Sequence, residues 1–276
     1  MSTTVPPTTR RSAQRGGLTG GLSGGLRGAV ASEWTKLWSV RSVWWNLLAS
    51  ALLMAAAAGQ EAIYVVNENT NTDPADDPGV TALGAVAISS VLLAQFTVIA
   101  LAMLVITAEY ATGTIRATLQ WTPSRGRVLL AKTAVVAAVT FVVGALLGAL
   151  GSAVADPVLG EWGRFPVAET VGDVLAVATY LALISVFTLG VGTALRSAVG
   201  TLTTVFMIIM VVPTALGVLD NEFVNRIVDG LPGVAGYHFM RGGSDPYPPA
   251  VGLALLVAWA VAAMLAGYAA LRSRDA

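Results

Sequence analysis

The chain has 276 residues, of which 55% are hydrophobic and only 12% are charged, and its formal net charge is zero. A soluble domain of this size does not devote so much sequence to continuous apolar segments. The absence of cysteine excludes a disulfide framework, a thiolate nucleophile and a cysteine-based metal site. The composition therefore predicts an all-α polytopic membrane protein.

Six apolar runs have the length of a membrane span. A helix needs about 20 apolar residues to cross a hydrocarbon core that is about 30 Å thick. We expect these runs to be the transmembrane helices of one domain, which covers residues 29–276. They lie at about 43–66, 81–108, 133–155, 174–195, 200–219 and 250–271.

The charged residues between the runs fall on alternating sides with opposite sign. With the amino terminus in the cytoplasm, the inner segments hold 13 of the 16 lysine and arginine residues. Lysine and arginine in short loops set the orientation of membrane proteins. We therefore expect both termini in the cytoplasm. The basic residues then belong to the membrane margins, and we expect no nucleic-acid partner.

The segment before the first span has two parts. Residues 1–28 are rich in Thr, Pro, Arg and Gly, so we expect a disordered cytoplasmic tail. From Val30 onward, apolar positions share one sector of a helix, and tryptophan beside cations is typical of the membrane interface. The sequence predicts an amphipathic interfacial helix, which anchors the chain in lipid and also suits contact with a cytoplasmic partner protein. Its marker residues are Trp34, Lys36, Trp38, Arg41 and Trp45.

Several polar side chains lie inside the predicted spans. A polar group in hydrocarbon is costly unless it faces protein or water. We therefore expect these residues to face the bundle interior or a dimer seam. They either form hydrogen bonds between packed helices or contact cargo along a pathway. They are Asn46, Gln60, Glu61 and Gln95.

The later part of the chain carries signals for close packing and for helix breaks. Gly144 and Gly148 are four residues apart, which lets two helices approach closely. Pro213 predicts a kink in the fifth span. The segment 220–249 predicts two short helices about a Pro-Gly break, too short to span, and hence a re-entrant or interfacial element. Its histidine, His238, is interpreted as an interface residue and not as a metal ligand.

The connection between the second and third spans is the sequence EYATGTIRATLQWTPSRGRVLLAK at 109–132. Glu109 ends the second span, and Gly113 permits a sharp change of direction. Residues 114–120 then predict a short helix that projects between the two spans. An ordinary basic juxtamembrane loop is the alternative.

Three segments, in this order among six spans, resemble the membrane subunits of type-2 ATP-binding-cassette exporters. They are SEWTKLWSVRSVWW at 32–45, EYATGTIRATL at 109–119 and LPGVAG at 231–236. The resemblance implies a connecting helix before the first span, a coupling helix between the second and third spans, and re-entrant helices before the sixth. The residues that it places in the coupling segment are Glu109, Gly113, Thr114, Ile115, Arg116 and Leu119.

The resemblance also implies a function. Residues 29–276 would be the permease of an ATP-driven exporter, paired with a second copy or a paralogue to form the translocation path. Each permease would dock on a separate cytoplasmic ATPase. The sequence has no GxxxxGK[ST] motif to cradle phosphates. We therefore expect ATP and Mg in the partner chain, and no cofactor, metal or catalytic site in this one.

Two other functions stay open at this point. One is a carrier or channel that works without ATP, and the other is a non-transporting sensor or immunity subunit built on the same fold. An intramembrane enzyme is disfavoured, because the spans lack cysteine and clustered acids. The excess of arginine over lysine is typical of a GC-rich bacterial gene, so we expect a multi-pass protein of a bacterial plasma membrane.

Overall fold

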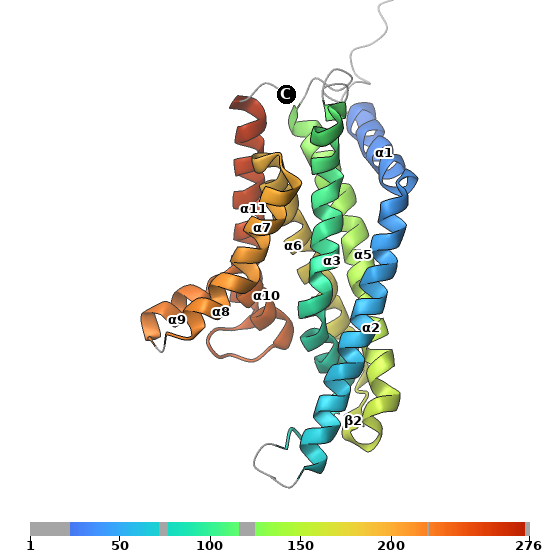
Figure 1. The fold of residues 1–276 in the computed structure, drawn as a ribbon, viewed down its shortest axis with the longest axis vertical. Helices are drawn as coiled ribbons and strands as arrows, with labels where there is room; N and C mark the ends of the chain where they lie inside the picture. The colour runs from blue at the N-terminus through green and yellow to red at the C-terminus, as the bar shows by residue number, and fades with distance from the viewer. Residues whose placement is uncertain (1–22, 72–76, 116–124, 220, 274–276) are drawn as a thin grey trace, which may run out of the picture.

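A computed structural model describes residues 23–71, 77–115, 125–219 and 221–273 (Figure 1). These residues are almost all helical, which confirms the predicted fold class. In chain order the elements are α1 (Ser23–Ser39), α2 (Arg41–Thr70), β1 (Thr81–Ala82), α3 (Leu83–Thr112), α5 (Arg125–Leu159), η2 (Gly160–Trp162), β2 (Gly163–Arg164), α6 (Val167–Leu195), α7 (Ala198–Phe206), η3 (Met207–Val211), α8 (Val212–Gly217), α9 (Glu222–Asp229), α10 (Pro232–Arg241) and α11 (Pro249–Ser273).

Within the described ranges, six helical segments are long and apolar enough to cross a membrane. They overlap all six predicted spans, so that prediction is confirmed. Several extend beyond the apolar runs. The 35 residues of α5, at about 1.5 Å each, exceed the thickness of a hydrocarbon core. The segments are Arg41–Thr70, Leu83–Thr112, Arg125–Trp162, Val167–Leu195, Ala198–Gly217 and Pro249–Ser273.

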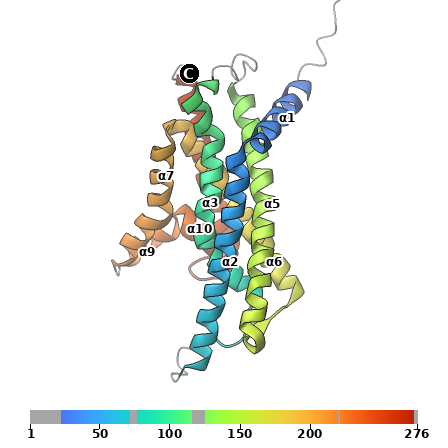
Figure 2. The ribbon, with the colours of Figure 1, turned by 45° about the vertical axis from the view of Figure 1, so that its right-hand side comes forward.

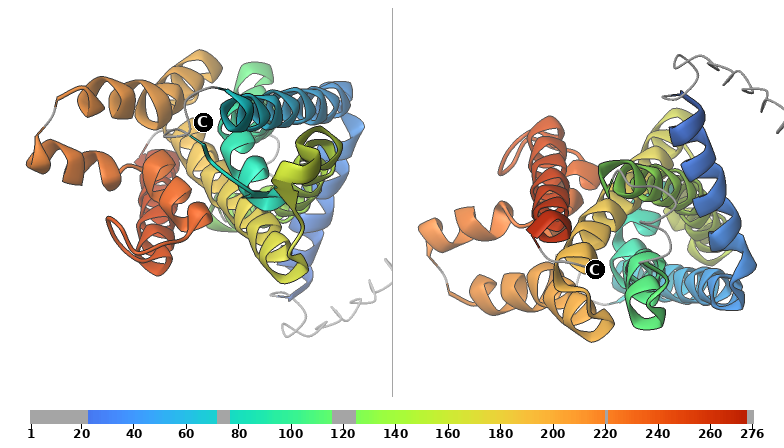
Figure 3. Two further views of the ribbon diagram at one scale, coloured as in Figure 1. Left: turned by 90° about the horizontal axis from the view of Figure 1, so that it is seen from below. Right: turned by 90° about the horizontal axis from the view of Figure 1, so that it is seen from above.

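Helix α6 lies at the centre of the bundle. It contacts α3 and α5 on one side and α11 on the other, as the views along the bundle show (Figure 3). Small residues allow these contacts. A Cβ atom on Gly144 of α5 would lie 2.8 Å from the Cα of Ala178, and one on Gly190 would lie 2.5 Å from the carbonyl carbon of Ala263 in α11. The close packing predicted at Gly144 and Gly148 therefore occurs within this chain, against α6.

The predicted amphipathic helix ends earlier than the sequence suggested. Val40 has extended backbone angles (φ −95°, ψ 120°), so α1 ends at Ser39 and α2 begins at Arg41. The prediction that Val30 to Trp45 form one helix is therefore wrong, because Arg41 and Trp45 belong to the first span. The break lets α1 lean across α5 (Figures 1 and 2).

The amino-terminal end of α1 also differs in position from the expected boundary. The helix begins at Ser23, inside the segment 1–28 for which the sequence predicted disorder. The predicted tail before it, residues 1–22, lies outside the described residues. The helix therefore includes the last six residues of the predicted tail, or about 1.7 turns at about 3.6 residues per turn.

The fifth span is interrupted close to the predicted place. Met207–Val211 form a π-helical turn, in which the backbone N–H of Val212 donates to the carbonyl of Met207. Pro213 follows, and a proline supplies no backbone N–H, so the regular ladder cannot continue through it. Beyond this turn, α8 and α9 swing away from the bundle (Figure 1).

The two short helices predicted in 220–249 are present as α9 and α10. The Oδ1 atom of Asn221 caps α9 by accepting from the N–H groups of Phe223 and Val224. Pro232 begins α10, a position where its missing N–H is harmless. The indole of Trp259 in α11 donates to the carbonyl of Gly230 at 2.8 Å and stabilises the turn between α9 and α10.

We predict that the contact between α6 and α11 tolerates no added atom at Gly190. Gly190→Ala should lower the apparent melting temperature in detergent, because overpacking costs about 1–3 kcal/mol. Gly172→Ala in the same helix is the matched control, since no atom lies within 4 Å of its added Cβ. Equal melting temperatures for the two variants would contradict the packing described here.

Candidate functional site

The described part of the predicted coupling segment is a sharp bend at the end of α3. Gly113 has φ +71°, in the left-handed region that favours glycine, so the predicted change of direction is confirmed. Gly113 and Thr114 are exposed. Ile115 is buried and packs with Ala102, Ile106, Val136 and Leu189. Arg116, Leu119 and the rest of the predicted short helix lie outside the described residues.

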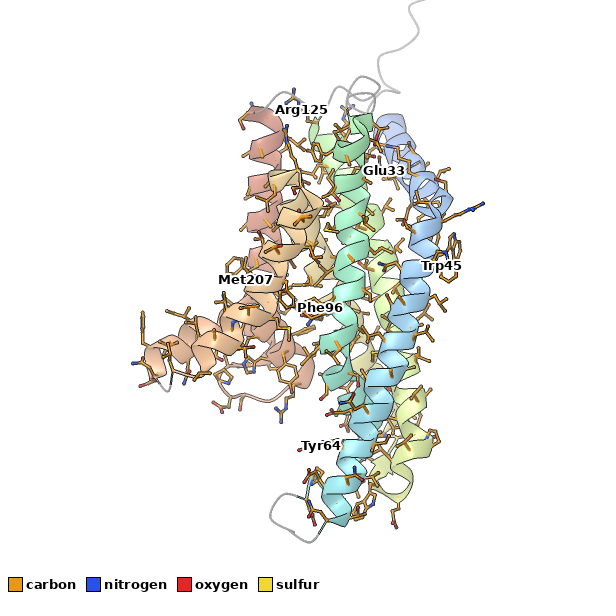
Figure 4. All side chains as sticks on the ribbon, viewed as in Figure 1. Glu33, Trp45, Tyr64, Phe96, Arg125 and Met207 are labelled. Atoms are coloured by element: carbon orange, nitrogen blue, oxygen red, sulfur yellow. The ribbon has the colours of Figure 1, made fainter. Side chains whose placement is uncertain are left out.

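Glu109 lies one turn before this bend, inside a cluster of four charged side chains. Lys132 of α5 donates to Glu33 of α1 and to Glu109 of α3, with Nζ–O distances of 2.5 and 2.8 Å. Lys36 of α1 contacts the same two carboxylates at 2.9 and 3.0 Å. These four residues form the ion-pair cluster, which joins α1, α3 and α5; Figure 4 shows Glu33 between α1 and α3.

The ion-pair cluster is largely removed from water. Only 1% of Lys132, 6% of Glu33 and 9% of Glu109 is exposed. A buried charge is tolerated only where partners replace its hydration. Lys132 meets this requirement with both carboxylates and a longer contact to the carbonyl of Val105, at 3.4 Å. Glu109 is therefore an internal residue of the bundle, while Gly113 and Thr114 supply the exposed surface.

Helical spacing explains how the sequence builds this joint. Leu37 follows Glu33 on α1 by four residues, and on α5 Val135 and Val139 follow Lys132 by three and seven residues; positions with these spacings share a helix face. Leu37, Val135 and Val139 pack together in a buried apolar cluster. The charged and apolar contacts thus continue each other along the same two helix faces.

The pKa of Lys36 is raised above its usual value. Burial alone would lower this pKa, but the hydrogen bonds and the negative charges of Glu33 and Glu109 outweigh that effect. Lys36 therefore remains a cation at neutral pH.

Two of the tryptophans predicted for the interface, Trp34 and Trp38, gather with Trp44 at the joint between α1 and α2. The Trp38 ring lies 5.6 Å from that of Trp34 and 5.1 Å from that of Trp44, centroid to centroid. Trp45 is 71% exposed and points away from the bundle (Figure 4). Arg41 is also exposed. The position of these residues in a membrane interface stays a prediction.

The polar residues predicted to face the interior occupy different environments. Gln95 is buried, and its Oε1 accepts a hydrogen bond from the hydroxyl of buried Tyr180 of α6. Asn46 is partly buried, near the joint of α1 and α2; along α2, Glu61 is also partly buried and Gln60 is exposed. The structure thus brings Gln95 into a contact between helices. Contact of any of the four with cargo stays a prediction.

Away from the ion-pair cluster, His238 takes part in a small polar group around α9 and α10. Its Nε2 lies 3.4 Å from Oδ1 of Asp229, and the hydroxyl of Tyr247 donates to the carbonyl of Asp229 at 2.5 Å. Burial and the charge of Asp229 raise the pKa of Tyr247 to about 12. Across the described ranges, no three His, Cys, Asp or Glu residues gather in a way that would hold a metal ion.

Sequence reasoning missed two members of the ion-pair cluster. Glu33 and Lys132 both lie in segments that the sequence analysis quoted, 32–45 and 109–132, but neither residue was given a role. One signal was available. Lys36 and Lys132 are the two lysines of the chain, in a composition where arginine supplies the other 14 basic residues.

The family model of the ABC-2 family transporter proteins matches residues 29–223, which is more than half of the chain. The search of curated proteins found no match to this chain. The matched region contains most of α1, the first five spans, the ion-pair cluster and the bend at Gly113, and it ends in α9.

We predict that the two lysines of the ion-pair cluster contribute very differently to stability. Lys132→Met leaves two buried carboxylates short of a partner and should cost about 3–5 kcal/mol. Lys36→Met should cost about 1 kcal/mol or less, because its side chain is 43% exposed. Thermal unfolding of both variants in one detergent checks this. Equal falls in melting temperature would show that Lys132 is not the centre of the cluster.

Proposed function

The chain belongs to the ABC-2 family of transporter proteins, and we propose from this premise that it is the permease subunit of an ATP-driven exporter. Membrane components of this family have no ATPase site of their own. ATP and Mg therefore belong to a separate cytoplasmic ATPase that docks on this chain. The chain itself supplies the multi-pass bundle through which cargo leaves the cell.

The observation that carries this proposal is the ion-pair cluster at the base of the exposed bend. The ATPase contacts the surface at Gly113 and Thr114, and ATP binding moves that surface. Ile115 and Glu109 on either side of it are buried, so the bend cannot move independently of the bundle. Through Glu109, the movement reaches α1 and α5 at once, because both helices are tied to the same carboxylate.

A second permease completes the translocation path. Among the six segments, Ala198–Gly217 is the least buried within this chain. In its most apolar stretch 17% of the residues are buried, against 67% in α6. Its apolar surface includes Phe206, Met207 and Met210. Figure 2 shows α7 on the far side of the bundle from α5, where a partner has open access. We assign the path to the space between this surface and the second subunit.

The proposal predicts which side of the membrane carries the bend. The chain has no cysteine, so Thr114→Cys and Asn67→Cys each create a single exposed thiol. In intact cells, an impermeant maleimide should label Asn67→Cys and leave Thr114→Cys unlabelled until the membrane is opened. The opposite pattern would place the bend outside and exclude docking of a cytoplasmic ATPase.

The proposal also predicts that the backbone at Gly113 matters for coupling. Gly113→Ala adds no clash, but an alanine in the left-handed region is strained by about 1–2 kcal/mol. We expect the complex with its ATPase, captured through a tag on this chain, to assemble normally and to lose most of its transport-linked ATPase activity. Gly172→Ala is the control that should keep full activity. Normal coupled activity in Gly113→Ala would contradict the assignment of the bend.

A further inference from the structure

A cavity of about 320 Å³ lies beside the ion-pair cluster, under the break at Val40. This elbow cavity is lined by α1, α2, α3 and α5, is partly open, and has a mostly apolar wall. The α3 face contributes Leu101, Leu104 and Ala108, which recur at helical spacing, and α2 contributes Val43. Its volume is at the lower end of the range for small-molecule sites, about 300–1,000 Å³. It therefore suits a single apolar chain better than two.

The polar end of the elbow cavity offers hydrogen-bond acceptors. Oε1 of Glu109 receives both lysines, but its other carboxylate oxygen, Oε2, is buried without a hydrogen-bond partner. The side-chain oxygen of Asn46 is buried and unpartnered in the same way. Both residues line the cavity. Buried acceptors without donors cost about 1–3 kcal/mol each, so a ligand that donates to them gains that energy.

Lys132, the buried cation at this end, already uses its donors. The three N–H groups of Lys132 point to Glu33, Glu109 and the carbonyl of Val105. An anionic headgroup would therefore meet oxygens that repel it. The two lysines and two glutamates also balance each other, so an ammonium headgroup would add an uncompensated charge in a poorly hydrated site. An uncharged donor avoids both penalties.

We propose that the elbow cavity binds a single-chain lipid whose uncharged headgroup donates hydrogen bonds through hydroxyl groups. The headgroup hydroxyls meet Glu109 and Asn46, and the acyl chain lies along the apolar face of α3. This binding goes beyond the exporter function, because it requires neither the ATPase nor a second permease.

The test uses the full chain in nanodiscs of phosphatidylcholine and a 1-monoacylglycerol with a diazirine in its acyl chain. After photolysis, the labelled peptides should fall within 40–47 and 101–108. Unlabelled 1-monooleoylglycerol should compete about tenfold better than methyl oleate, which has the same chain and no donor. Equal competition by methyl oleate, or equal labelling of the exposed α5 surface around Leu146, would overturn the proposal.

Two matched variants check the location. Leu104→Trp fills the elbow cavity and should reduce labelling at least about fivefold, whereas Leu146→Trp, on an exposed surface of α5, should leave it unchanged. Undiminished labelling in Leu104→Trp would refute the site. Gel filtration verifies that each variant is folded, and the competition experiment on the unaltered chain decides the question independently if Leu104→Trp is not.

Discussion

The end of the bundle that carries α1 depends on the ion pairs of Lys132. This ammonium group is almost completely buried and joins two carboxylates from helices that are distant in the sequence. Charges in such a place are stable only as a set, because the loss of one member leaves the others without hydration or a partner. The position of α1 on the bundle, the end of α3 and the start of α5 are therefore fixed by one common requirement.

This arrangement separates two tasks within the segment that we propose to couple the bundle to an ATPase. Exposed Gly113 and Thr114 form the surface available to another protein, while buried Glu109 and Ile115 attach that surface to the bundle. Had Glu109 been exposed, it would not have joined the bend to α1 and α5 through its ion pairs with the two lysines of the ion-pair cluster. Its burial next to α1 and α5 means that the bend is joined to both helices one turn away.

Local signals in the sequence were sufficient for much of this fold. The six spans followed from apolar length, the turn at Gly113 from glycine, and α9 and α10 from their short apolar runs about Pro232. The ion-pair cluster could not be predicted in this way, because it depends on which faces of α1, α3 and α5 meet. The break at Val40 had no local signal either, since a valine between two helical patterns favours no turn.

The break at Val40 has a mechanical consequence. A continuous helix from Ser23 to Thr70 would be one rod and would pivot as a whole. With an extended residue between the two helices, α1 instead lies across the ends of α3 and α5 and is joined to both by the ion-pair cluster. If α3 slides past α5, either α1 must move with them or the ion pairs must separate and leave unpaired charges in lipid. The molecule is thus restricted to motions in which all three ends travel together.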